Sequence, residues 1–593
     1  MNRPIQTMLM RKLSGELPLT PRHQQRPQES AMQSLHRQHL ASLGNRGKTS
    51  DLFCIFHQVQ ESGLAAAIAW PEDPPKSNAK AAELLAQGDE LMALDNVFRH
   101  DEAVRRYNES LCWAEQGSEV MALGYAARSK VCVENEEYEF ALYNVALARK
   151  QPNCSPDLLE ELTTCETKCR EQIAEGKSFA NAPFARLPMR LEPNPRIPFM
   201  AKGLAMKQDP DYGRCLIPDD EIFRPGDVLM EEEALVAMND PKFRLVNCNY
   251  CTEMKAFQLI PCPGCCSVMY CSEECLEKDG QGGHRFECGI GEKLNYLHTS
   301  NAIGPRMFFA GLTMFNDDVV EMRKFCESHK RSGANPLELD YRNIDGLELE
   351  KFKNFHQVKF PNFDANQRRQ FAFAACLYQQ AYLKHPLVQS LFVTEPNRKF
   401  MLRYFYDYIQ ALAYLNVTHW NKAVSSFFPI ASICNHSCEP DAILTGGTRT
   451  AKLIALRILD PNDQIFITYG PNWFRDYPNK PHGTRTQLSF DCICKVCNPI
   501  ERNFWVQMGC PFGPKALKHF QIVLSIIADP RAPHAAKLNM MQQFVEKFDV
   551  DYPNDELCSI LASYLDGLRK ASVERGLVLA RSEARERADK MLG

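Results

Sequence analysis

Four pairs of metal-binding side chains lie near the middle of this 593-residue chain. Zinc takes four nitrogen or sulfur ligands in a tetrahedron, and a short Cys-x-x-Cys turn supplies two of them. Eight ligands therefore predict two zinc ions in closed sites, which hold a fold and leave no open position for a catalytic water. Reduced structural thiols are the alternative, but they would require eight correctly spaced residues to arise by chance. The predicted ligands are Cys248, Cys251, Cys262, Cys265, Cys271, Cys275, His284 and Cys288.

A second group of cysteines, Cys492, Cys494 and Cys497, is one ligand short of a zinc site. The candidate for the missing ligand is Cys438, which ends an Asn-His-Ser-Cys segment. That pairing would hold two segments together across the chain between them and would add a third zinc ion. Cys266 is surplus to all of these sets, and we treat it as a bystander.

The composition favours metal sites over disulfides. Many of the 24 cysteines lie in short clusters, in a large chain with 45% hydrophobic residues, whereas disulfide-rich proteins are small and secreted. A net charge of −4 disfavours a chain-wide grip on nucleic acid, so direct nucleic-acid binding is not expected. The sequence has neither a secretory signal nor an apolar run of about 18 residues, which predicts an intracellular protein without membrane contact. We expect a monomer that acts in the cytoplasm and nucleus.

The first 77 residues are predicted to form a flexible basic leader. Residues 1–50 carry eight Lys and Arg against two Asp and Glu, together with many Gln, Ser and Pro. A mitochondrial transit peptide is the weaker alternative, because a clear amphipathic face is missing.

Residues 78–176 change to an Ala-rich pattern with helical spacing. Small and large residues alternate in two hairpins of about 34 residues, which is typical of tetratricopeptide repeats. A generic helical bundle is the alternative. The predicted helices cover 79–94, 102–115, 120–132 and 138–150.

Prolines between residues 183 and 198 break helix formation and mark a linker. The elements predicted after it are strands at 213–217 and 228–230, helices over about 294–420, a hairpin over 453–469 that turns at 460–463, and helices from 514 onward.

The order of these motifs carries a family resemblance. The four ligand pairs, with Tyr270 before the third, resemble a MYND finger, in which the first and third pairs share one zinc ion and the second and fourth share the other. The Asn435–Pro440 run, the hairpin ending at Tyr469, and Phe490 before the last cysteines resemble a SET domain with its post-SET zinc site. The chain thus resembles the SET and MYND domain family of lysine methyltransferases, in the branch with N-terminal tetratricopeptide-like helices.

The resemblance implies roles for single residues. Tyr469 stands at the position of the catalytic tyrosine, and Phe490 at that of an aromatic residue which closes the cofactor and lysine pocket. The 212–214 turn would approach the methionine end of S-adenosylmethionine, and Asn435 and His436 would hold its amino and adenine groups. The residues expected at the cofactor are Tyr212, Gly213, Arg214, Asn416, Asn435, His436, Tyr469 and Phe490.

Three positions depart from the family pattern. Cys215 replaces the second glycine of a Gly-x-Gly turn, Asp441 replaces an asparagine, and Leu488 replaces a tyrosine near the lysine channel. These departures leave open whether the SET core is active.

The expected fold is an α+β multi-domain protein: a split, β-rich SET domain with an inserted MYND finger, flanked by helical regions. The expected domains are the leader 1–77, tetratricopeptide-like repeats 78–176, linker 177–199, first SET part 200–247, MYND finger 248–288, helical SET insert 289–420, second SET part 421–475, post-SET zinc site 476–500 and C-terminal helical domain 501–593.

The resemblance implies an enzyme that transfers a methyl group from S-adenosylmethionine to lysine side chains of histones or other proteins. Protein substrates and partners would bind through the finger and the repeat-like helices. The alternative is a non-catalytic scaffold in which the finger and the helices bind proteins beside a degenerate SET domain.

Overall fold

The computed structural model describes residues 31–43, 51–61, 63, 68–94, 99–329, 331–343, 346–359, 363–415, 417–420, 423–469, 492–498, 514–552 and 555–593. Among these residues, no helix combines the length and the hydropathy needed to cross a membrane.

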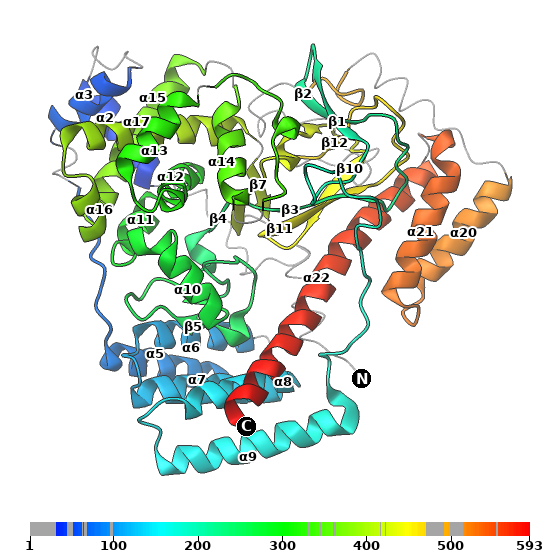
Figure 1. Ribbon diagram of the computed structural model, residues 1–593. Helices are drawn as coiled ribbons and strands as arrows, with labels where there is room; N and C mark the ends of the chain where they lie inside the picture. Colours follow the sequence, from blue (N-terminus) through cyan, green and yellow to red (C-terminus); the bar gives the residue numbers. More distant parts are fainter. Residues whose placement is uncertain are drawn as a thin grey trace.

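Two helical hairpins form the N-terminal layer, beneath the metal-binding finger in Figure 1. Ser77 and Ser118 cap the first helix of each hairpin by accepting backbone N–H groups with their hydroxyl oxygens. The helices approach closely because Gly88 faces Tyr107, where a methyl group would collide with the ring. The four helices confirm the predicted ones: α5 (Asn78–Met92), α6 (His100–Trp113), α7 (Glu119–Glu134) and α8 (Tyr138–Arg149), followed by α9 (Pro156–Gln172).

The prediction of a flexible leader is wrong for two segments, α2 (Ala31–Leu43) and α3 (Leu52–Glu61). Both helices pack on α15 (Ala365–Tyr382), far along the chain. Apolar residues at helical spacing, such as Leu52, Ile55 and Val59, are buried in that contact. The sequence analysis did not predict these helices, because the short apolar stripe lies among basic residues and glutamines.

The β-rich core is assembled from strands before and after the finger. One antiparallel sheet has the order β10 (Ala442–Gly446), β11 (Thr450–Ala455), β3 (Val228–Glu233). A second has the order β4 (Val236–Asn239), β8 (Val424–Phe427), β7 (Val417–Trp420). The two parts of the split domain are therefore joined by backbone pairing. The remaining core strands are β1 (Leu204–Asp209), β2 (Gly213–Pro218), β9 (Asn435–His436) and β12 (Phe466–Ile467).

The predicted hairpin over 453–469 does not form. β11 pairs with β10 and β3, and β12 pairs in parallel with β9, placing Phe466 opposite Asn435 and Ile467 opposite His436. Adjacent strand-like runs suggested a hairpin, but each run finds its partner elsewhere in the sheet system. The parallel pair brings the Asn-His-Ser-Cys segment beside the residues that lead to Tyr469.

A helical insert lies between the finger and β7. Its core is rich in aromatic rings, including Phe308, Phe309, Phe352 and Tyr408. The insert consists of α11 (Gly291–Leu297), α12 (Ile303–Met314), α13 (Val319–Ser328), α14 (Leu347–Gln357), α15, α16 (Pro386–Leu391) and α17 (Glu395–Tyr414).

The C-terminal helices are α20 (Pro514–Ala528), α21 (His534–Phe548) and α22 (Asp555–Leu592). In Figure 1, α22 runs diagonally from α21 beside the β core to α8 in the N-terminal layer. Arg581 of α22 forms a buried ion pair with Glu137, the residue before α8. The last helix thus ties the β core, the finger and the N-terminal hairpins into one body.

Candidate functional site

The first metal-binding group combines the first and third ligand pairs. The sulfur atoms of Cys248, Cys251, Cys271 and Cys275 all lie within 4.8 Å of one another. One pair sits on a turn, and the other joins the end of β6 (Met269–Tyr270) to α10 (Glu273–Gln281). The hydroxyl of Ser272 caps α10 by accepting the N–H of Cys275, which fixes the direction of that ligand.

The second and fourth ligand pairs form a separate group. The ligand atoms of Cys262, Cys265, His284 and Cys288 lie within 4.8 Å of one another, and His284 Nε2 is 3.3 Å from Cys262 Sγ. Each group offers the four sulfur or nitrogen donors that tetrahedral zinc takes. Cys266 is in neither group, and its thiol donates to the Pro74 carbonyl oxygen at 3.6 Å.

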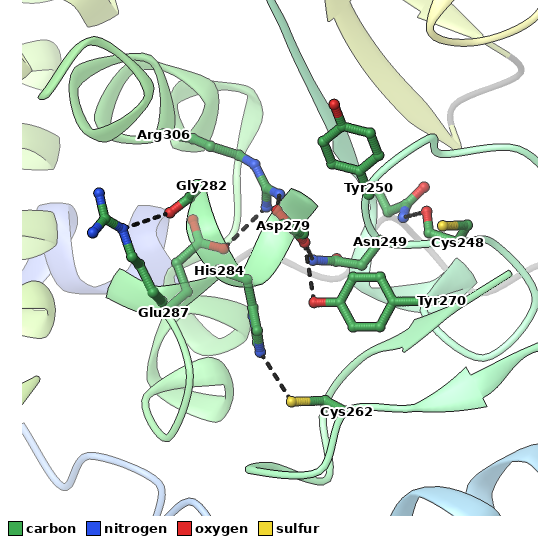
Figure 2. Close-up of polar contacts among 12 residues, drawn as sticks. Cys248, Asn249, Tyr250, Cys262, Tyr270, Asp279, Gly282, His284, Glu287 and Arg306 are labelled. Atoms are coloured by element: carbon green, nitrogen blue, oxygen red, sulfur yellow. Dashed lines mark hydrogen bonds and ion pairs between the residues drawn. The ribbon is translucent and has the colours of Figure 1, made fainter. Parts of the chain in front are cut away.

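A buried carboxylate, Asp279, connects the finger to the helical insert (Figure 2). It accepts hydrogen bonds from Asn249 Nδ2 at 2.6 Å and from the Tyr270 hydroxyl at 3.1 Å. Arg306 of α12 bridges Asp279 and Glu287, with N···O distances of 3.4 and 3.0 Å. Burial disfavours the charged guanidinium, but the two carboxylates outweigh it and raise the pKa of Arg306. The sequence analysis missed this network, because nothing in the spacing of Asp279 and Arg306 relates them.

The last cysteine cluster meets the predicted fourth ligand. Cys438, Cys492, Cys494 and Cys497 are all buried, and their sulfur atoms lie within 4.8 Å of one another. The Cys438 and Cys497 sulfur atoms are 3.6 Å apart. Four converging thiols fit a structural zinc ion and join the strand-rich core to the segment that precedes the C-terminal helices.

Tyr469 is connected to this cluster through the His436 ring. Its hydroxyl donates to the Cys434 carbonyl oxygen at 2.8 Å, and its backbone N–H donates to His436 Nδ1 at 3.1 Å. The two rings are 5.3 Å apart between centroids. Burial raises the pKa of the Tyr469 phenol, so the hydroxyl stays protonated near neutral pH.

The 212–214 turn comes to the same place from the first SET part. Gly213 has a φ of +75°, and a Cβ added there would find only Gln208 Nε2, at 3.8 Å. The backbone is therefore open to close approach by a ligand. Asn435 Nδ2 donates to the Arg214 carbonyl oxygen at 2.8 Å. The Tyr212 ring packs edge-on against the Phe466 ring, with 5.0 Å between the ring centroids.

The side chains of Asn435 and His436 are both engaged within the protein. Asn435 Nδ2 also donates to Gln464 Oε1 at 2.9 Å, which leaves its carbonyl oxygen as the group for a ligand. The His436 ring faces Tyr469 on one side and Cys438 Sγ, 3.5 Å from Nε2, on the other. A cofactor contact at this residue would therefore come from its backbone.

Of the other sequence candidates, Asn416, Phe490 and Leu488 lie outside the described residues. Cys215 is buried in β2 and donates its thiol to the Lys207 carbonyl oxygen at 3.5 Å, so the hairpin accommodates it. Asp441 lies 3.6 Å from Arg457, and burial raises the pKa of Asp441 to about 6.

Glu232 is a site residue that the sequence analysis did not select. Its fully buried carboxylate accepts the backbone N–H of Ile430 at 3.0 Å and that of Ala431 at 2.8 Å. Burial raises the pKa of this carboxyl group. Glu232 thereby anchors the turn that leads into Cys434. In the sequence it is the middle of three consecutive glutamates on a strand, which gives no signal of this role.

Comparisons with known proteins agree with this architecture. The model of the MYND finger family matches residues 248–288. Protein-lysine N-methyltransferase SMYD4 of Homo sapiens is 24% identical over 462 residues, which cover 64% of this chain and 56% of that protein. The Danio rerio protein of the same name is 20% identical over 508 residues, 71% of this chain and 66% of that protein. N-lysine methyltransferase SMYD2 of Sus scrofa is 21% identical over 293 residues, 47% of this chain and 57% of that protein.

The chain therefore spans between about half and two thirds of the length of these relatives. It has a MYND finger, inserted between the two parts of a β-rich core that backbone pairing joins. The chain thus has a MYND finger and is similar to proteins named as SET and MYND domain-containing or as protein-lysine N-methyltransferases.

Proposed function

We propose that the chain is a protein-lysine N-methyltransferase that uses S-adenosylmethionine. The observation that carries the proposal is the meeting of Tyr469, the Asn435-His436 strand and the Tyr212–Arg214 turn, which come from three separate segments. The names of the relatives support the same reaction class. Histones and other lysine-bearing proteins are the proposed substrates.

The bound cofactor would supply a methyl group on a positively charged sulfur atom. Gly213 leaves room for a ligand near the backbone, and the side-chain carbonyl oxygen of Asn435 offers a hydrogen-bond acceptor near this turn. The protonated Tyr469 hydroxyl is held by the Cys434 carbonyl oxygen and would orient the reacting groups. Alignment of the amine with the methyl group is the main demand of this displacement, so positioning matters more than acid or base strength.

The three cysteine-rich groups have structural roles in this proposal. Two zinc ions would hold the finger, and a third would pin Cys438 to the Cys492–Cys497 segment behind the reaction site. The finger and the N-terminal helices would also bind protein partners. We further propose that the protein acts in the cytoplasm and nucleus.

The test is methyl transfer to the proteins of a cell lysate, with full-length protein and methyl-radiolabelled S-adenosylmethionine. We expect labelled protein bands, a strong loss of labelling in Tyr469→Phe, and unchanged cofactor binding by calorimetry. Tyr143→Phe, in the N-terminal layer, is a matched control that should label normally. If the wild-type protein neither binds the cofactor nor labels any band, the proposal fails and the non-catalytic scaffold is the remaining function.

A further inference from the structure

We propose that His436 is a positioning residue whose imidazole connects the third cysteine cluster to the backbone of Tyr469. The role in methyl transfer rests on the function proposed above. The connection itself is a property of the chain and can be measured without catalysis.

The first step concerns the proton on the ring. His436 Nδ1 is 3.1 Å from the backbone nitrogen of Tyr469, which can only donate. Nδ1 must therefore be the acceptor, and the proton of the neutral ring lies on Nε2. The backbone of Tyr469 thus fixes the tautomer of this histidine.

The second step concerns the other side of the ring. Nε2 lies 3.5 Å from Cys438 Sγ, and the side chains of both residues are 3% exposed. A zinc ion bound by four thiolates carries a net charge of about −2, and N–H donors around such a cluster stabilise it. The Nε2–H group of His436 is placed to be such a donor. Neither of its ring nitrogens faces open solvent in this arrangement.

The third step concerns Tyr469. Its hydroxyl is held by the Cys434 carbonyl oxygen, while His436 holds its backbone N–H. The strand pair reinforces this hold, because the Ser437 N–H donates to the Ile467 carbonyl oxygen at 3.0 Å. Removing the imidazole would loosen one end of Tyr469 and leave the hydroxyl contact in place. A loosened cluster would have the same effect, since the ring would lose its support.

The test compares His436→Leu, which removes both contacts, with His436→Gln, whose amide can still donate and accept. The matched control is His356→Leu, which removes an imidazole that is equally buried, at 2% exposure, in the helical insert. Zinc release to a chromogenic chelator and amide hydrogen exchange at Tyr469 are measured on the full chain.

In His436→Leu we expect one zinc ion to be released about tenfold faster than in the wild type, with faster exchange at Tyr469. His436→Gln should recover part of both effects, and His356→Leu should match the wild type in both. Under the proposed function, His436→Leu should also lower kcat more than it raises the KM for S-adenosylmethionine.

Wild-type zinc release and exchange in His436→Leu would overturn the inference. If that variant does not fold, His436→Ala, which also removes both contacts, replaces it, and wild-type zinc release and exchange in His436→Ala would likewise overturn the inference. A wild-type protein that transfers no methyl group would instead refute the proposed function and leave the zinc and exchange results standing.

Discussion

Arg128 Nη1 in α7 donates a hydrogen bond of 2.8 Å to the carbonyl oxygen of Leu259 in the finger, 131 positions later in the chain. The guanidinium is completely buried. The side-chain oxygens of Asn108 and Asn144 accept hydrogen bonds from it. Their amide groups in turn donate to finger carbonyl oxygens, Asn108 to that of Ala256 and Asn144 to that of Phe257. The N-terminal hairpins therefore recognise the backbone of the finger through three polar side chains.

Arg128→Leu should lower the free energy of unfolding by about 3 kcal/mol or more, because two amides and a carbonyl group lose a buried partner. Urea unfolding of the full chain, followed by circular dichroism, measures this loss. Lys130→Ala is the control, since that exposed lysine pairs with Glu161 on the surface and should change the stability by less than about 0.5 kcal/mol. Equal losses in the two variants would contradict the role given to Arg128.

Local patterns in the sequence were sufficient for the helices of the hairpins and for the ligand pairs of the finger. Helical spacing and Cys-x-x-Cys turns are determined by residues within a few positions of one another. The contacts that join the parts were not predictable in this way. Arg128 reads as an ordinary helix-surface residue until the finger covers it, and Glu232 reads as one of a run of strand glutamates.

In the candidate site, too, some features could be predicted from the sequence and others could not. The pairing of Cys438 with the last cysteine cluster followed from counting ligands, because three thiols are one short of a zinc site. The direction of the His436 ring could not be predicted from the sequence, because it depends on the parallel pairing of β9 with β12. That pairing replaced the predicted hairpin. A strand's partner is set by the packing of the whole sheet, which a short window of sequence does not contain.

The buried ion pair between Arg581 and Glu137 should be costly to break from one side. The side chains are 5% and 7% exposed, and Arg581 Nε donates to Glu137 Oε2 at 2.7 Å. Arg581→Ala leaves a buried carboxylate and should lower the free energy of unfolding by about 3 to 5 kcal/mol. The double variant Arg581→Met with Glu137→Leu should recover most of this loss, because no unpaired charge remains. Urea unfolding of the wild type, of Arg581→Ala and of the double variant measures both effects.

Arg585→Ala is the control for that comparison, because Arg585 is 41% exposed and pairs with Asp589 one turn along α22. It should change the stability little. A double variant as unstable as Arg581→Ala would argue that packing, and not the ion pair, makes this contact important.

Metal analysis should distinguish the three cysteine-rich groups. The wild-type chain is expected to bind three zinc ions, one for each group of four ligands. Cys497→Ser should reduce the zinc content to two per chain, because it removes a ligand from the last group only. Mass spectrometry of the metal-loaded protein measures this directly. Cys266→Ser should keep all three, since Cys266 is in none of the three ligand groups and its thiol donates to the Pro74 carbonyl oxygen. Three zinc ions in Cys497→Ser would rule out the third site.

His356 should make the stability depend on pH on the acid side of neutrality. Burial lowers the pKa of His356 well below its usual value, and Arg331 and His329 lower it further. Nε2 lies 2.6 Å from the Tyr408 hydroxyl, deep in the helical insert. The unfolded chain takes up a proton at His356 as the pH falls through about 6.5, whereas the folded chain does not. Stability is therefore lost as the pH falls, by up to about 1.4 kcal/mol per pH unit.

The measurement is the urea midpoint at pH 7.5 and at pH 5.5 for the wild type and for His356→Gln, whose amide keeps an acceptor for Tyr408. Both proteins have the same zinc ligands, so any loss of metal at low pH affects them equally and cancels in the comparison. The wild type should lose more stability than the variant between the two values. An equal loss would mean that the His356 ring takes up its proton inside the folded insert, where Arg331 and the surrounding phenylalanine rings would have to tolerate a second positive charge.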